Sequence, residues 1–211
     1  MMFKAIREEL KEHAPFTAVG ALSGVALIFF FRNIPQHISY ELFYVFHPLH
    51  VLLSALVTAS MYRLHTCSQG HGKHCNLPLL LIVGYAGAIG IATLSDSIMP
   101  YIGETLLNMP HRQHHIGFIE KWWLVNAMAI VGIIIAYFNP STKFPHFGHV
   151  LISTWASLFH VLMAASGTMP PAMYAAIFIF LFLTVWLPCC ISDIVFPLLF
   201  VKKVQKGAQS C

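Results

Sequence analysis

Charged side chains are scarce in this sequence. Asp, Glu, Lys and Arg together make up 9% of its 211 residues, whereas they make up roughly a quarter of an ordinary soluble domain. A soluble protein of this size could not cover its surface with so few charges. The shortage therefore excludes a cytosolic globular enzyme, a nucleic-acid-binding protein and a disordered chain. Apolar residues reach 57% and the mean hydropathy is +0.71, so we expect lipid to surround most of the chain.

Long apolar stretches recur along the sequence. A membrane-spanning helix needs about 20 predominantly apolar residues. The stretches that meet this need are residues 15–31, 43–62, 77–101, 122–138, 150–165 and 172–201. The sequence thus predicts an all-α integral membrane protein with six transmembrane helices. The first stretch does not resemble a signal peptide, because its leader mixes Lys, Arg and Glu and no small-residue cleavage site follows it.

The basic residues predict how these helices are oriented. Six spans place both termini on the same side of the membrane. With the N-terminus inside, the inner segments contain Lys4, Arg7, Lys11, Arg63, Lys73, Lys143, Lys202, Lys203 and Lys206, and the outer ends contain Arg32, Arg112 and Lys121. An excess of Lys and Arg marks the cytoplasmic side. We therefore expect both termini to be cytoplasmic, in a plasma membrane, and the net charge of +4 to anchor the chain rather than to bind nucleic acid.

Two motifs occur twice, in the same order. Residues 47–52 (HPLHVL) match residues 146–151 (HFGHVL), and residues 95–100 (SDSIMP) match residues 192–197 (SDIVFP). The copies are separated by nearly the same number of residues (146 − 47 = 99 and 193 − 96 = 97). Two specific matches in register indicate an internal duplication.

The duplication predicts an inverted repeat. Each copy has three spans, an odd number, so the second copy must enter the membrane from the opposite face. We expect residues 1–105 to form a first three-helix repeat with a cytoplasmic Cys/His loop at 66–76. Residues 106–201 would form the second, inverted repeat, and residues 202–211 a cytoplasmic tail.

In this topology, imidazoles and carboxylates gather near each face of the membrane. The outer cluster would contain His47, His50, Asp96 and one of His114 or His115, and the inner cluster His13, His146, His149 and Asp193. Two His at i and i+3 lie on one helix face and can reach one ion. Imidazole with carboxylate suits zinc, iron, manganese, cobalt or nickel. An ionised Asp within a span is unfavourable by about 2.5–3.5 kcal/mol unless it faces a wet or paired interior.

The loop between the second and third stretches carries four further candidate ligands. They are Cys67, His71, His74 and Cys75, interleaved with Gly. The loop is expected to be cytoplasmic, where thiols stay reduced, which favours metal capture over a disulfide. Cys189 and Cys190 lie one turn before Asp193, where one of them could face the inner cluster and favour zinc or copper. The pattern favours instead that they are small apolar residues of a membrane helix.

These patterns favour a transporter of a divalent transition-metal cation, with zinc or iron preferred. Matched sites at the two faces suit alternating access by exchange of the repeats' conformations. Coupling to protons would follow, since His must be neutral to bind metal. The expected partners are the metal cation and the lipid bilayer, without nucleic acid, and a homo-oligomer is compatible with the sequence. No catalytic residue is assigned, and the direction of transport and the choice between channel and carrier stay open.

Two other functions remain as alternatives. The first is a b-type dihaem electron carrier, because two stretches have a His near each end: His50 and His65 in one, His146 and His160 in the other. The second is a membrane metalloenzyme acting on lipid, either a hydrolase or an oxidase. Residues 111–115 (HRQHH) resemble one histidine box of the membrane fatty-acid desaturases and hydroxylases. That resemblance covers five residues and implies no role for any of them here.

Overall fold

The described part of the chain is helical, apart from its turns and connections. The computed structural model describes residues 2–31, 34–66, 76–141, 143–165, 170–190 and 196–200, with side chains except at 2–13, 16, 31, 143–147, 190 and 198. The elements are α1 (Met2–Phe31), α2 (Gln36–Thr66), α3 (Leu77–Thr93), η1 (Leu94–Ile98), α4 (Met99–Leu106), α5 (Gly117–Glu120), α6 (Trp122–Phe138), α7 (Lys143–Ala164), α8 (Pro171–Cys190) and α9 (Phe196–Leu199). These described residues contain no strand, so the predicted all-α class is confirmed.

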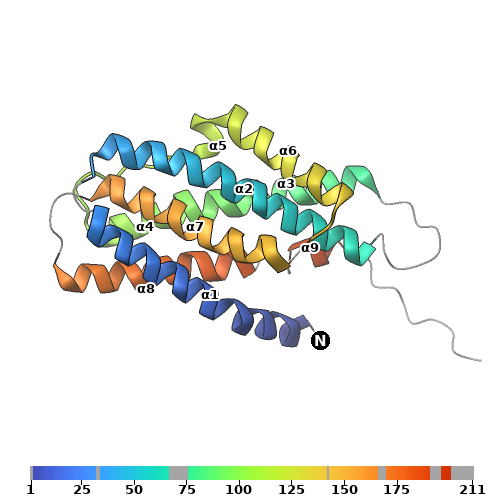
Figure 1. The fold of residues 1–211 in the computed structure, drawn as a ribbon, viewed down its shortest axis with the longest axis horizontal. Helices are drawn as coiled ribbons and strands as arrows, with labels where there is room; N and C mark the ends of the chain where they lie inside the picture. Colours follow the sequence, from blue (N-terminus) through green and yellow to red (C-terminus); the bar gives the residue numbers. More distant parts are fainter. Residues whose placement is uncertain are drawn as a thin grey trace, which may run out of the picture.

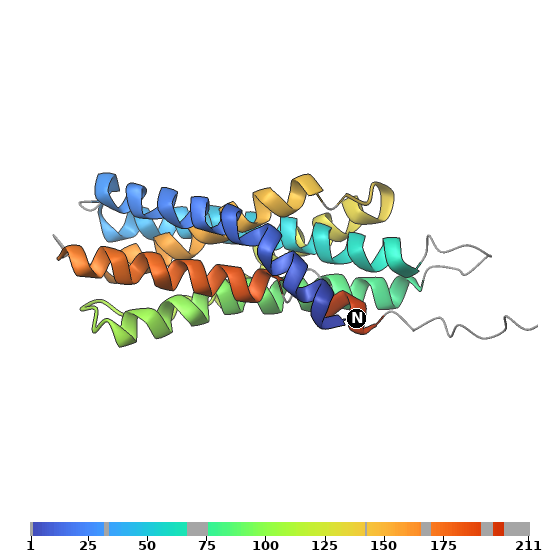
Figure 2. The ribbon, with the colours of Figure 1, turned by 90° about the horizontal axis from the view of Figure 1, so that it is seen from below.

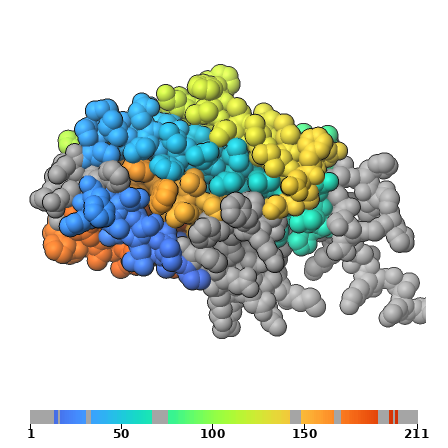
Figure 3. Space-filling view, viewed as in Figure 1, coloured from blue at the N-terminus to red at the C-terminus, as the bar shows by residue number. Residues whose placement is uncertain are grey.

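The long helices lie side by side along the long axis of the molecule, as Figure 1 and Figure 2 show. α2 is central, because it contacts α3, α6 and α7. α1 packs against α7 and α8. On the face drawn in Figure 3, α6 lies along α2 and covers part of it. α2 and α7 run in opposite directions, as their colours in Figure 1 show, so that residues early in one helix meet residues late in the other.

Two apolar cores hold the helices together. The first joins α2, α3 and α6 through small and branched residues such as Ala55, Val83 and Ile133. The second joins α1, α2, α7 and α8, with Ile28 and Leu181 among its fully buried members. Burial of apolar surface contributes roughly 25 cal/mol per Å². α2 belongs to both cores, which fixes it as the element around which the others are arranged.

The outside of the bundle is apolar, while its inside contains ionisable side chains. Large apolar residues are more than half exposed on α1, α3 and α8, among them Phe30, Ile82 and Ile179. Imidazoles and carboxylates, by contrast, are fully buried on α2, α4, α7 and η1. Within the part of the chain that the structure describes, three helices are long and apolar enough to cross a membrane: Gln36–Thr66, Leu77–Leu106 and Pro171–Cys189. Shorter apolar helices are Thr17–Phe30, Trp122–Phe138 and Gly148–Ala164.

The structure corrects the expected ends of several helices. α1 and α7 begin at Met2 and Lys143 rather than at residues 15 and 150. α2 begins at Gln36, seven residues before the expected start at Phe43, and the helical segment from Leu77 continues to Leu106 rather than ending at residue 101. Hydropathy marks where a helix is apolar, whereas the helix itself continues into more polar sequence. His50 therefore lies roughly 21 Å from the first residue of α2, and neither it nor Asp96 is at a helix end.

Candidate metal centre

A π-helical turn presents the central carboxylate. In η1 the Met99 N–H bonds the carbonyl of Leu94, one residue further back than in an α-helix. That shift frees the carbonyl of Ser95, which instead accepts a hydrogen bond of 3.0 Å from Ser157 Oγ on α7. Pro100, with no N–H to donate, begins the following α-helix. Single π turns inside α-helices are frequent at functional sites.

The carboxylate of Asp96 links three helices. Its Oδ2 accepts hydrogen bonds from Nδ1 of His47 at 3.0 Å and from Nδ1 of His50 at 2.6 Å. Its Oδ1 accepts from Ser95 Oγ at 2.7 Å and from Ser153 Oγ at 2.9 Å. The carboxylate and both imidazoles are fully buried. The structure thus brings together His47, His50 and Asp96, as the sequence pattern led us to expect.

These hydrogen bonds bear on which ring nitrogen of each imidazole carries the proton. With each ring donating its Nδ1–H to Asp96, Nε2 carries the lone pair when the imidazole is neutral. Within the described residues, neither His47 Nε2 nor His50 Nε2 has a hydrogen-bond partner. Metal-binding His almost always donates its second ring N–H to a carboxylate or carbonyl in this way. Asp96 is therefore placed to orient ligands, in addition to supplying charge.

Only one of these two rings faces further candidate ligands. His47 stacks on Phe43 with ring centroids 5.2 Å apart. A Cβ built on Gly117 would lie 2.5 Å from His47 Nε2, so the backbone of α5 closely covers this atom. His50 instead stacks on His149 of α7, with ring centroids 4.5 Å apart and planes inclined by 24°.

Cys189 of α8 completes a buried group of three candidate metal ligands. The ligand atoms of His50, His149 and Cys189 all lie within 4.8 Å of one another, and the three residues are buried. Ligand atoms around tetrahedral zinc are roughly 3.3–3.6 Å apart, given Zn–N of about 2.0–2.1 Å and Zn–S of about 2.3 Å. Small side-chain movements would therefore close the group around an ion. Cys189 Sγ also lies 3.9 Å from Ser153 Oγ, which connects it to Asp96.

The expected inner and outer clusters would separate His149 from the His47/His50 pair, but the structure places them together. The ring of His149 meets His50 directly, so one buried site contains members of both clusters. The physical reason is that α2 and α7 pack lengthwise in opposite directions, and the His47/His50 pair lies near the middle of α2, opposite the first turns of α7 that contain His149. The remaining predicted ligands His13, Cys67, His71, His74, Cys75, His146 and Asp193 lie outside the described side chains.

His114 and His115 do not join Asp96. Both lie in the irregular segment between α4 and α5, and His114 is exposed against Tyr101. His115 Nδ1 lies 3.2 Å from Oε1 of Glu120, and its ring packs edge-on against Tyr40. This segment lies beyond the end of α4, whereas Asp96 is in the interior of the helical segment. The histidine-box pattern at 111–115 therefore contributes no member of the buried group formed by His50, His149 and Cys189.

Glu120 is the centre of a separate polar group at the start of α6. Its Oε2 accepts hydrogen bonds from Tyr44 at 2.6 Å and Tyr40 at 3.2 Å. Burial opposes ionisation of Glu120, but the hydrogen bond from Tyr44 and the proximity of His115 outweigh it and lower the pKa of the carboxyl below its ordinary value.

A second buried carboxylate–imidazole pair was not foreseen. His160 Nδ1 on α7 lies 2.7 Å from Oε1 of Glu104 on α4, and both side chains are at most 1% exposed. The sequence pattern indicated His160 only as a candidate haem ligand and did not indicate Glu104. The same haem alternative used His65 of α2, but this side chain is exposed and its Nδ1–H donates to the carbonyl of Met61.

Comparisons with known proteins find no match. None of the protein-family models fits the chain, and neither the curated proteins nor the solved structures contain a match. The class of protein is therefore described by fold and site alone. It is a helical protein with membrane-length apolar helices and a buried group of His, Cys and Asp side chains.

Proposed function

We propose that this chain is a membrane transporter of a divalent transition-metal cation, zinc or iron being favoured. The observation that carries the proposal is the buried convergence of His50, His149 and Cys189, with Asp96 bonded to His50. Imidazole, thiolate and carboxylate are the ligands that zinc takes in proteins. The group lies about halfway along α2, where a cation crossing a membrane would need a substitute for its hydration shell.

The internal repeat favours a cation that is transported over a metal ion that stays bound as part of the structure. His50 and His149 are equivalent residues of the two copies (149 − 50 = 99), and they stack on each other. Two further polar positions on the same helices, Ser54 and Thr58, match Ser153 and Ser157 at this separation. Residues related by a twofold axis meet only close to that axis. A site at such an axis, between inverted three-helix repeats, is where many transporters bind substrate.

The proposed topology follows from the repeat. The three long apolar helices and the three shorter ones together would make six spans in two inverted triplets. The distribution of Lys and Arg places both termini in the cytoplasm, in a plasma membrane. Exchange of conformation between the triplets would open the central site to each side in turn.

Each residue of the site has a distinct part in binding the cargo cation. Asp96 holds the Nδ1–H of His50, which leaves Nε2 as a lone-pair donor. His149 supplies a second imidazole from the opposite repeat. Cys189 loses its thiol proton when a cation binds, since only the thiolate is a good ligand. The resulting negative charge, together with that of Asp96, balances a divalent ion without another anion.

Flux measurements on the purified full chain in proteoliposomes test this function. A trapped zinc indicator should report entry of Zn²⁺ into vesicles containing the unsubstituted protein. We expect His50→Ala and His149→Ala each to lower the flux by about tenfold or more, because even outer partners of metal ligands contribute about 10–100-fold to affinity. His65→Ala, on the same helix as His50 but exposed, should retain the flux. Unchanged flux in both His50→Ala and His149→Ala would contradict the proposal.

A further inference from the structure

The Glu104–His160 pair repeats the geometry of the Asp96–His50 pair. In each, a carboxylate on the α3–η1–α4 segment lies against Nδ1 of a buried imidazole, at 2.7 Å in one and 2.6 Å in the other. Asp96 and Glu104 are eight residues apart, so the two pairs are separated by roughly 12 Å along the bundle. The second pair is therefore distinct from the central site but aligned with it.

Two buried atoms of this second pair are left for a ligand. Among the described residues, Glu104 Oε2 and His160 Nε2 have no hydrogen-bond partner, and both side chains are almost completely buried. Because the Nδ1–H is donated to Oε1, His160 Nε2 carries a lone pair. With Glu104 ionised and His160 neutral, both atoms are acceptors, so the group that satisfies them must be a donor or a cation. His160 Nε2 points away from the carboxylate that holds Nδ1, so it would bind a divalent transition metal while Glu104 orients the ring and supplies charge.

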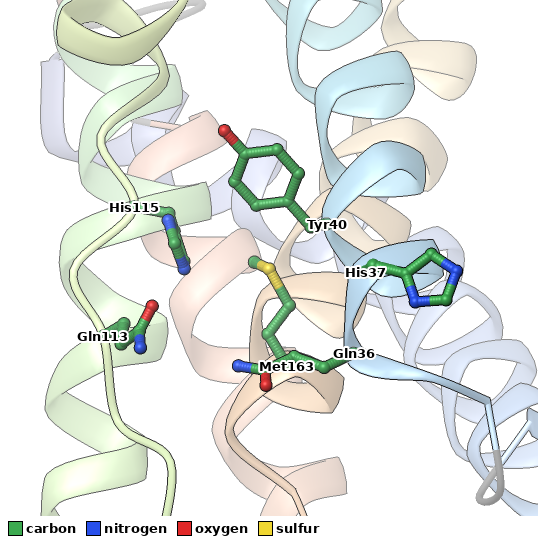
Figure 4. A pocket seen from close by; sticks show the side chains of 6 residues that line it. All are labelled: Gln36, His37, Tyr40, Gln113, His115 and Met163. Carbon is green, nitrogen blue, oxygen red and sulfur yellow. The ribbon is translucent and has the colours of Figure 1, made fainter.

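Contacts connect this pair to a pocket at one end of the bundle. The pocket has a volume of about 420 Å³ and is lined by Gln36, His37, Tyr40, Gln113, His115 and Met163 (Figure 4). In Figure 4 the thioether of Met163 extends between His115 and Tyr40, while His37 points away from them. The ring of His115 lies 5.9 Å from that of His160. The pocket therefore presents imidazole, amide and thioether groups beside the second pair.

On its other side the pair connects to the central site. Phe43 contacts His160 edge-on at 5.4 Å between ring centroids and stacks on His47 at 5.2 Å. His47 in turn bonds Asp96. The sequence of contacts from the pocket inwards is thus His115, His160, Phe43, His47 and Asp96, all on α2, α7, η1 or the segment after α4.

We propose that Glu104 and His160 form a second binding site for a divalent transition-metal cation, between the pocket and the central site. This inference rests on the proposed function, because the second site would hold the same transported cation on its way to the central site. We call the Glu104–His160 site the relay site. His115 is the residue that leads from the pocket to this relay site, and Phe43 separates the relay site from the central one. The cation would move inwards from one carboxylate–imidazole pair to the next.

Titration of the purified full chain with Co²⁺, followed by absorbance and metal content, tests the relay site. A thiolate-to-cobalt band that Cys189→Ser removes reports the central site. We expect Glu104→Gln and His160→Gln each to bind one Co²⁺ fewer per chain than the unsubstituted protein while this Cys189-dependent band persists. Persistence of the band also shows that these variants are folded. The matched control Glu120→Gln changes a carboxylate at the same end and should retain the full number of Co²⁺.

The outcomes separate the two proposals. The relay-site proposal is overturned if both Glu104→Gln and His160→Gln bind as many Co²⁺ as the unsubstituted chain. Water would then be the hydrogen-bond partner of Glu104 Oε2 and His160 Nε2. The central site remains supported in that case if the Cys189-dependent band is present. Absence of any Cys189-dependent band instead counts against the central site, whatever the metal content of the Glu104→Gln variant.

Discussion

Asp96 is a buried carboxylate that is bonded to four buried polar side chains. It accepts hydrogen bonds from two imidazoles and two serines, all inside the bundle. A buried charge with one partner removed is typically destabilising by about 3–5 kcal/mol. The four bonds spread over both oxygens explain why a carboxylate is tolerated here. They also make the orientation of the His47 and His50 rings depend on a single residue.

The Asp96→Asn substitution tests whether the carboxylate orients the two imidazoles, because it leaves the size and shape of the side chain unchanged. The amide has the same size, but it is uncharged and has only one accepting oxygen, so it holds the Nδ1–H groups of the two imidazoles less strongly than the carboxylate does. The Nε2 lone pairs are then fixed less firmly. We expect zinc affinity to fall by about 10–100-fold, measured by competition with a zinc chelator in detergent. Ser95→Ala, which removes one of the four donors, should have a smaller effect. Equal zinc affinity in Asp96→Asn and the unsubstituted chain would show that Asp96 does not orient a ligand.

At this scale the sequence predicted some contacts and missed others. The His-x-x-His spacing and the rarity of Asp in apolar helices predicted His47, His50 and Asp96 as neighbours. Spacing along one helix does not show which other helix lies opposite, so the contact of His149 with His50 and the approach of Cys189 were not predicted. A signal for the α7 side was present: His149, Ser153, Ser157 and His160 recur at i, i+4, i+8 and i+11, on one face of an otherwise apolar helix.

At the scale of the elements, α2 and α6 approach each other closely at Gly132. A Cβ on Gly132 would lie 2.3 Å from the carbonyl oxygen of Leu52, so no side chain fits between these two backbones. Small residues allow such close packing between membrane helices. The hydropathy pattern predicted each helix but placed the start of α2 too late, because residues 36–42 are polar and still helical. It contained no information on which helices would approach this closely.

Gly132→Ala should therefore destabilise the bundle. Alanine improves helix propensity by about 1 kcal/mol, but the methyl group must push α6 away from α2, and overpacking is unfavourable by about 1–3 kcal/mol. We expect a lower temperature of thermal unfolding in detergent. Gly90→Ala is the matched control, since a Cβ there meets nothing within 4 Å and should leave the unfolding temperature unchanged or raise it. An unfolding temperature for Gly132→Ala as high as that of Gly90→Ala would argue against the close approach.

As a whole, the described part of the bundle presents many apolar side chains outwards and buries four imidazoles and two carboxylates inside. This arrangement was predictable in outline, since so few charges in so apolar a chain suit only a lipid surrounding. The expected separation into two clusters was not found for the described residues, because it assumed that each His pair marks a helix end. In the structure the equivalent imidazoles His50 and His149 stack near the middle of the bundle. One shared buried site agrees better with a single cation passing between two repeats.

X-ray absorption at the zinc edge, on the purified full chain loaded with Zn²⁺, tests the central claim most directly. The account predicts a zinc site with mixed ligands, with Zn–N at about 2.0–2.1 Å and one Zn–S at about 2.3 Å. The sulfur contribution should decrease by one ligand in Cys189→Ser, and the imidazole contribution should decrease in His149→Ala. Spectra that are the same in both variants as in the unsubstituted protein, or a chain that retains no zinc, would contradict a metal site between α2, α7 and α8.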